Sequence, residues 1–218
     1  MKMKRTLALI ALITLLCIPT LAHANLLTNG SFETVGTSTV KFPGWSTDAA
    51  EGGWNSGNWA RRADAPYATN GSWYAKCWWD GGISQTVAIT GGTTYAISLD
   101  SYLPANENEL ATWAGFAKVQ FLNASDVVLE ETTVADLVSL ARSTWVSTSA
   151  QLAAPVPATK ARVLLGMYWD DSSGSSVNPP NPTSFDNVNF DVVPEPSSLL
   201  LLGTGIIGML SATRKRKA

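Results

Sequence analysis

The chain has 218 residues, a formal net charge of −2, one histidine and 45% hydrophobic residues. A single histidine excludes zinc sites built from several histidines. The length suits one ordinary domain plus short extra segments. Residues 25–193 hold eight basic and sixteen acidic side chains, a net charge of −8, so nucleic acid is excluded as a partner. Calcium or a neutral polymer suits such a surface better.

Residues 1–24 have the features of a secretory signal peptide with a helical apolar part. Three basic residues precede the apolar stretch 6–16, and Ala22-His23-Ala24 fits the small-x-small cleavage rule. Cleavage there removes the only histidine, His23, and one of the two cysteines. A domain without histidine excludes Ser-His-Asp and Cys-His catalysis. The remaining cysteine, Cys77, lies in an apolar run, and we interpret it as a buried thiol, because no second cysteine is left to form a disulfide.

The middle of the chain shows the alternation of short β-strands. Gly91-Gly92 and Asn123–Asp126 predict turns, and only residues 133–141 suit a short helix. Many short strands separated by turns predict an all-β fold, a jelly-roll β-sandwich, as one domain at residues 25–193. The predicted strands are residues 83–89, 95–103, 118–121, 127–133, 145–152, 160–169 and 183–192.

Four short motifs follow one another along this domain. They are Asn25–Glu33 (N-L-L-T-N-G-S-F-E), Pro43-Gly44-Trp45, residues 82–95 and Ser184–Val188. Their order resembles that of galactose-binding-like jelly rolls, which include many carbohydrate-binding modules. The resemblance covers most of residues 25–193 and implies the jelly-roll fold. Sugar binding follows less directly from it, because this fold hosts many functions.

Asp186 is unusual for its place in a predicted strand. Alternation gives it the same face as Val188 and Phe190, which is the core-facing side. A buried carboxylate is costly unless it is paired or bound to a metal. The resemblance implies that Glu33 and Asp186 share a structural calcium ion, completed by backbone carbonyl oxygens. The alternative is that Asp186 lies at the strand end and caps a turn.

All nine tryptophans lie in the predicted exported domain. We assign Trp45, Trp73, Trp79 and Trp145 to the core, where most tryptophans pack. The others lie in polar or glycine-rich loops, or point away from the core. An exposed indole offers a flat apolar face to a pyranose ring, although each of these side chains also suits packing of a loop on the sandwich. The candidate ligand-binding residues are Trp54, Trp59, Trp78, Trp113 and Trp169.

The acidic residues show no arrangement for catalysis. Glycoside hydrolysis needs two carboxylates at a suitable separation, but Glu130-Glu131 and Asp170-Asp171 are adjacent pairs, which a strand directs to opposite faces. The sequence has no phosphate-binding loop and no activated nucleophile. We therefore predict a protein that is not an enzyme and has no catalytic residues.

Residues 194–218 have three parts in a fixed order. Pro194-Glu195-Pro196 comes first, then an uncharged apolar run at residues 197–213, then the basic cluster Arg214–Lys217. The run is close to the shortest helix that spans a bilayer, and basic residues favour the cytoplasmic side, which leaves the domain periplasmic. The order resembles the PEP-CTERM sorting signal of Gram-negative bacteria. The resemblance implies processing by an exosortase; a plain C-terminal anchor is the alternative.

Two functions remain. In the first, an exported protein is anchored in the inner membrane by its C-terminal helix, reaches the cell surface or the extracellular matrix after processing, and binds exopolysaccharide through its loop tryptophans. In the second, the domain is a structural matrix or surface protein of a biofilm without specific glycan binding.

Overall fold

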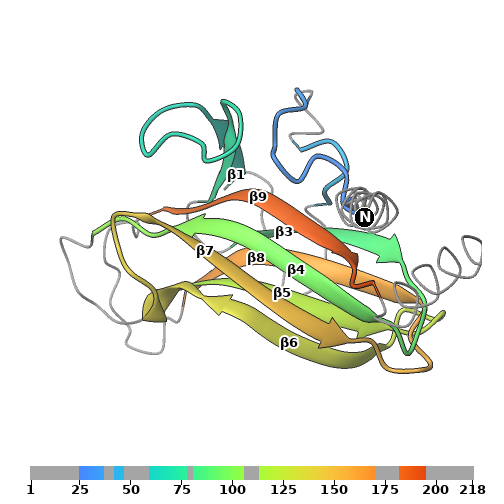
Figure 1. Cartoon of the computed structure of the whole chain (residues 1–218). Coiled ribbons are helices and arrows are strands. Elements are labelled where there is room, and N and C mark those ends of the chain that lie inside the picture. The colour runs from blue at the N-terminus through green and yellow to red at the C-terminus, as the bar shows by residue number, and fades with distance from the viewer. Residues whose placement is uncertain are drawn as a thin grey trace, which may run out of the picture.

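The computed structural model describes residues 25–36, 42–46, 59–77, 81–105, 113–169 and 182–194. In this part of the chain, nine strands form two antiparallel sheets that pack face to face (Figure 1). The predicted all-β jelly-roll sandwich is confirmed. The predicted signal helix and C-terminal helix lie outside the described residues.

Five strands form the first sheet, in the order β1-β2-β9-β4-β7, and four form the second, in the order β3-β8-β5-β6. The first sheet consists of β1 (Trp59–Arg62), β2 (Tyr74–Cys77), β9 (Thr183–Val192), β4 (Thr94–Tyr102) and β7 (Trp145–Ala153). The second consists of β3 (Gly81–Ala88), β8 (Lys160–Trp169), β5 (Trp113–Leu122) and β6 (Val128–Asp136).

Each predicted strand has a counterpart in the structure, whereas the predicted helix at residues 133–141 is wrong. Strand β6 continues to Asp136 because the β-branched residues before it stay paired with β5. Only Leu137–Ser139 turns, as a 3-10 helix, and the Asp136 side chain caps it by accepting from the N–H of Val138. The four-residue strands β1 and β2 were not among the predicted strands.

The core lies between the sheets and is rich in aromatic side chains. Tyr95 and Phe190 stack with ring centroids 5.2 Å apart, which joins β4 to β9 on the inner face. Trp45 is buried against Phe32, 5.6 Å between centroids, so its predicted core position is confirmed. Cys77 is buried, as predicted, and forms no disulfide among the described residues.

Residues 26–30, which precede β1 in the chain, lie beside β9 and form main-chain hydrogen bonds with it. Leu26 N donates to Phe190 O, and Val188 N donates to Gly30 O, both at 2.9 Å. A Cβ on Gly30 would overlap the Val188 carbonyl, so only glycine allows this approach. The first and last motifs of the resemblance, far apart in sequence, therefore lie side by side.

Candidate functional site

The outer face of the five-stranded sheet carries a row of four large or polar side chains. Lys76 of β2 pairs with Ser184 of β9, Ser184 with Tyr102 of β4, and Tyr102 with Trp145 of β7. Their chain neighbours Ala75, Phe185 and Ser101 are buried toward the core. Because strand side chains alternate between faces, the four residues of the row point away from the core.

Trp145 was predicted to be a core residue, and this is wrong. It is half-buried, on the outer face, where its ring lies 5.6 Å from Tyr102 and 5.7 Å from Tyr74. The alternation in β7 is genuine, but the apolar side that includes Leu152 is the one that faces the core. The indole is covered by a loop instead of by the other sheet.

That loop consists of residues 63–70 and crosses the outer face. Side chains of the sheet donate hydrogen bonds to its carbonyl groups. The Trp145 indole N–H donates to Tyr67 O at 2.8 Å, and the Tyr74 hydroxyl lies 3.2 Å from Ala65 O. Burial raises the pKa of Tyr74, which keeps the phenol protonated as a donor. The loop in turn presents Tyr67 to solvent, 68% exposed and in the left-handed backbone region.

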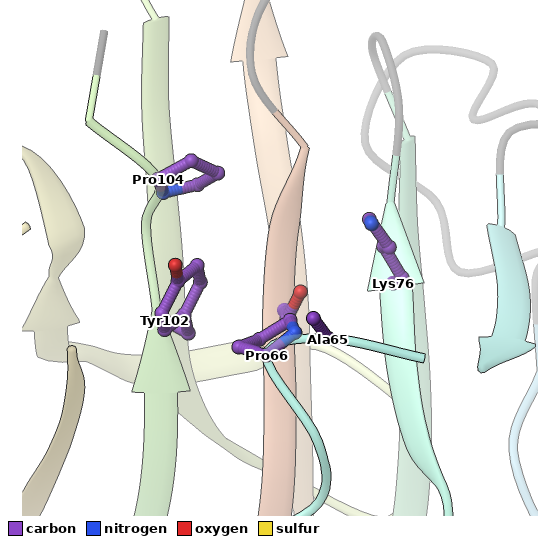
Figure 2. Close-up of a pocket in the computed structure, with 6 residues that line it drawn as sticks. Ala65, Pro66, Lys76, Tyr102 and Pro104 are labelled. Atoms are coloured by element: carbon purple, nitrogen blue, oxygen red, sulfur yellow. The ribbon is translucent and has the colours of Figure 1, made fainter. Parts of the chain in front are cut away.

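A pocket of about 200 Å³ lies between this loop and the end of β4. Its lining residues are Ala65, Pro66, Lys76, Tyr102, Pro104 and Ser184. Figure 2 shows Pro66 between Lys76 on one side and the Tyr102 and Pro104 rings on the other. The Ser184 side chain is buried, and within the described part of the chain its hydroxyl is the one buried side-chain polar atom without a hydrogen-bond partner. Rings, a cation and an unpaired hydroxyl therefore meet in one pocket.

Asp186 is fully buried, but not on the face that alternation predicts. Asn187 has a φ of +51°, and the β4–β9 register shifts between Ser98 and Asp100. This bulge places Asp186 opposite Asp100 on the outer face, while Val188 returns to the core. The prediction of a core-facing Asp186 is therefore wrong, although its burial is real.

The Asp186 carboxylate holds the end of the loop. Its Oδ2 accepts from Thr69 N at 2.7 Å and from Asn70 N at 2.9 Å, and its Oδ1 accepts from Asn187 N. Burial raises the pKa of Asp186, and these N–H groups oppose that rise because they favour the ionised form. The capping part of the predicted alternative describes these contacts, although Asp186 lies within β9 and not at its end.

Asp100 extends this network with a second buried carboxylate. Ser147 Oγ donates to its Oδ1 at 2.5 Å, and Thr69 Oγ1 lies 2.6 Å from its Oδ2 and 3.0 Å from Asp186 Oδ2. A hydroxyl has one proton, so Thr69 donates to only one of the two carboxylates at a time. The loop is thus anchored on two acids that compete for one donor.

Glu33 holds the other end of the same turn. Its Oε1 accepts from Ser72 N at 2.8 Å and from Trp73 N at 2.7 Å. Arg61 lies over the Trp73 ring, 3.8 Å from its centroid, and donates to the carbonyl of Glu33. The two carboxylates predicted to share a calcium ion therefore converge on residues 69–73, where main-chain N–H groups are their partners.

The donor chemistry of Glu33 and Asp186 suits calcium, which prefers carboxylate and carbonyl oxygens. Asp186 Oδ2 already accepts from two main-chain N–H groups and shares the Thr69 hydroxyl with Asp100, so it would have to give up part of these contacts to bind an ion. Among the described residues, no group of three or more His, Cys, Asp and Glu side chains could hold a metal ion. Calcium stays a prediction.

The structure brings the backbone positions of three candidate tryptophans to one end of the sandwich. Trp59 is opposite Cys77 at the start of β1, and Trp113 is opposite Trp169 where β5 begins and β8 ends. The pocket lies at this same end, because Lys76, Ser184 and Tyr102 occupy the matching ends of β2, β9 and β4. Trp54 and Trp78 lie outside the described residues. Ligand contact by the five tryptophans stays a prediction.

Tyr102, Lys76 and Ser184 were missed as candidate site residues. Alternation in the predicted strand at residues 95–103 does place Tyr102 on the face opposite Leu99, at the strand end and two residues before Pro104. That position in the sequence could have indicated Tyr102 as a candidate site residue. Nothing local in the sequence indicates that the 63–70 loop closes over it.

Of the predicted sorting motif, Pro194 is described and half-buried, while Glu195 and Pro196 lie outside the described residues. Val193 N still donates to Thr94 O at 2.9 Å, so the pairing with β4 reaches the residue before the motif. No helix in the described part of the chain is long and apolar enough to cross a membrane.

Solved structures with the same fold serve different functions. The enzymatically active domain of bacteriophage CBA120 tailspike protein 4 is 12% identical, with a TM-score of 0.53, over 78% of this chain and 21% of its own. The Stig cyclase Fisc from Fischerella sp. TAU is 15% identical, with a TM-score of 0.52, over 79% of this chain and 99% of its own. The family 16 carbohydrate-binding module-2 is 16% identical, with a TM-score of 0.49, over 76% and 99%. At these identities the likeness to the tailspike domain and to the cyclase shows the fold alone.

A comparison with curated proteins found no match. The family model described as the PEP-CTERM protein-sorting motif matches residues 192–217, which include Pro194, Glu195 and Pro196. The order of Pro-Glu-Pro, apolar run and basic cluster is therefore that of a known sorting element: the chain carries a PEP-CTERM protein-sorting motif behind an all-β jelly-roll domain.

Proposed function

We propose that this protein is an exported, exosortase-processed surface or matrix protein whose jelly-roll domain binds extracellular polysaccharide. The glycan lies across the pocket on the outer face of the five-stranded sheet. It extends toward the end of the sandwich that carries the backbone of Trp59, Trp113 and Trp169. The domain acts as a binding module and not as an enzyme.

One observation carries the binding proposal: the unpaired, buried Ser184 hydroxyl in a pocket with ring-shaped walls. An unsatisfied buried hydroxyl costs about 1–3 kcal/mol, which a ligand hydroxyl recovers. The Tyr102, Pro66 and Pro104 rings supply the apolar surface that sugar C–H groups prefer. At about 200 Å³ the pocket is smaller than the roughly 300–1,000 Å³ of sites for drug-sized ligands, which suits one ring of a polymer.

The sorting part of the proposal is supported by the motif at residues 192–217. The apolar run at residues 197–213 anchors the chain in the inner membrane, and the basic cluster stays cytoplasmic. Exosortase then cuts near Pro194-Glu195-Pro196. We expect the intact mass of the protein recovered from outside the cells to lack the segment after this motif. A full-length mass at the cell surface would instead favour a plain anchor.

Affinity electrophoresis of the full-length chain in neutral detergent tests the binding part. We expect exopolysaccharide from the producing cells to retard the protein. Alanine at Trp54, Trp59 and Trp78 together is expected to reduce the retardation without changing the melting temperature. Unchanged mobility with every polysaccharide tried would favour the alternative, a structural matrix protein in which the domain is only a carrier.

We propose in addition that Glu33 and Asp186 hold a structural calcium ion. It would bring positive charge between two carboxylates that hold the ends of one turn. The support is the convergence of both side chains on residues 69–73. The melting temperature with and without a chelator is the direct measurement.

A further inference from the structure

The pocket has a charged side chain in its wall as well as rings. Lys76 lines it beside Ser184 and Tyr102, on the three adjacent strands β2, β9 and β4. Neighbouring strands lie about 4.8 Å apart, so the row from Lys76 to Tyr102 spans roughly 10 Å, enough for one sugar ring and a substituent. A ring over Tyr102 thus brings its far edge to the ammonium group.

Lys76 is the one charged residue among the described residues that line the pocket. The nearby Arg62 and Asp64 form an ion pair at 2.5 Å. Burial lowers the pKa of Lys76, since removing water from an ammonium group disfavours its charged form. A ligand anion restores that lost solvation more fully than a neutral hydroxyl, because charge-assisted hydrogen bonds are roughly twice as strong.

We propose that this pocket takes a carboxylate-bearing sugar unit, a uronic acid, with its carboxylate on Lys76, a ring hydroxyl on Ser184 and its apolar side on Tyr102. This rests on the proposed glycan binding and names the class of glycan. The domain as a whole is acidic, with sixteen acidic and eight basic residues between 25 and 193. From this net charge alone, a neutral polymer was the predicted kind of glycan. A local cation overrides that average because screening limits the distant charges to roughly 10 Å at about 0.1 M salt.

Calorimetry with a matched pair of probes tests the proposal on the full-length chain in neutral detergent. The probes are the galacturonic acid trisaccharide and the same trisaccharide with its carboxylates methyl-esterified. We expect the acid to bind about tenfold more tightly or better than the ester, the gain of one charge-assisted hydrogen bond. Lys76→Gln removes this preference, and Lys76→Arg retains it.

A control variant separates local from overall charge. Lys160→Gln removes the same charge from an ion pair with Asp126 on the other sheet, and is expected to leave the preference unchanged. Acetate supplies a carboxylate without a ring, and competition by acetate as strong as by the acid trisaccharide would overturn the sugar assignment. Equal affinity for acid and ester, or a preference that survives Lys76→Gln, would overturn the charge assignment.

The failure of this inference is distinguishable from failure of glycan binding. If neither trisaccharide binds while a neutral polysaccharide still retards the protein, the uronic acid assignment is wrong and the proposed function stands. If no glycan of either kind binds, both are wrong. A melting curve of each variant shows whether Lys76→Gln changed the fold. If it did, the Lys76→Arg variant and the comparison of the two probes on the unmodified protein still test whether the pocket prefers the acid.

Discussion

Replacement of Asp186 by alanine is expected to lower the free energy of unfolding by about 2–5 kcal/mol. The substitution removes the acceptor of Thr69 N and Asn70 N, which lie 2.7 and 2.9 Å from Asp186 Oδ2. Hydrogen bonds to a charged group contribute roughly 1.5–3 kcal/mol each, and the N–H of Asn187 loses its acceptor as well. Because Thr69 and Asn70 are exposed, water replaces part of this loss. Urea denaturation of the two proteins measures the difference. Glu130→Ala removes an exposed carboxylate and is expected to stay within about 0.5 kcal/mol.

Burial of the charged Asp186 carboxylate lowers the stability of the fold, whereas its hydrogen bonds raise it. The pH dependence of unfolding separates the two effects. Burial raises its pKa in the folded protein above the ordinary 3.8. Between these two values the folded state binds the proton more tightly than the unfolded chain, so the free energy of unfolding falls as pH rises through the interval. Asp186→Asn does not titrate and is expected to lose this slope. An identical slope in both proteins would contradict the assignment.

Chelation of the unmodified protein distinguishes the two roles of this carboxylate. If calcium joins Glu33 to Asp186, a chelator lowers the melting temperature, and added calcium restores it. If main-chain N–H groups alone satisfy both carboxylates, as the contacts of residues 69–73 allow, the melt does not change with chelator. The effect of Asp186→Ala is expected in either case.

The sheets could be predicted because strand alternation is a local property. The outward position of Tyr102 follows from the inward positions of Ile97 and Leu99 alone. Asp186 escaped the same reasoning because one residue in the left-handed region, Asn187, shifts the register and exchanges the faces. Asparagine tolerates this conformation better than most residues, so its presence permits a bulge but does not require one.

The site itself could not be predicted because its parts come from segments far apart in the chain. Pro66 reaches the pocket only because Trp145, 78 residues after Tyr67, donates to the loop, and Asp186, 117 residues after Thr69, accepts from it. No periodicity records such contacts. Short strands such as β1 and β2 have few residues and depend on their neighbours to form, because β2 pairs with β9 and β1 pairs with β2.

Replacement of Tyr102 by alanine is expected to weaken binding of the exopolysaccharide by about thirtyfold, as judged from its retardation in affinity electrophoresis. The ring lies in the middle of the proposed site, on β4 between Ser184 and Trp145, and central aromatic residues commonly contribute 2 kcal/mol or more to binding. Tyr102→Phe keeps the ring and removes one hydroxyl, so a loss below about tenfold is expected.

The ring of Tyr102 also contacts Trp145 at 5.6 Å, so alanine at this position removes packing as well as a ligand surface. Tyr102→Leu separates these effects, because leucine preserves apolar volume against the indole but offers no flat face to a sugar. We expect the leucine variant to melt near the unmodified protein and to bind as weakly as the alanine variant. Full retardation of the leucine variant would place the glycan elsewhere, and the tryptophans at the end of the sandwich would then be the next surface to test.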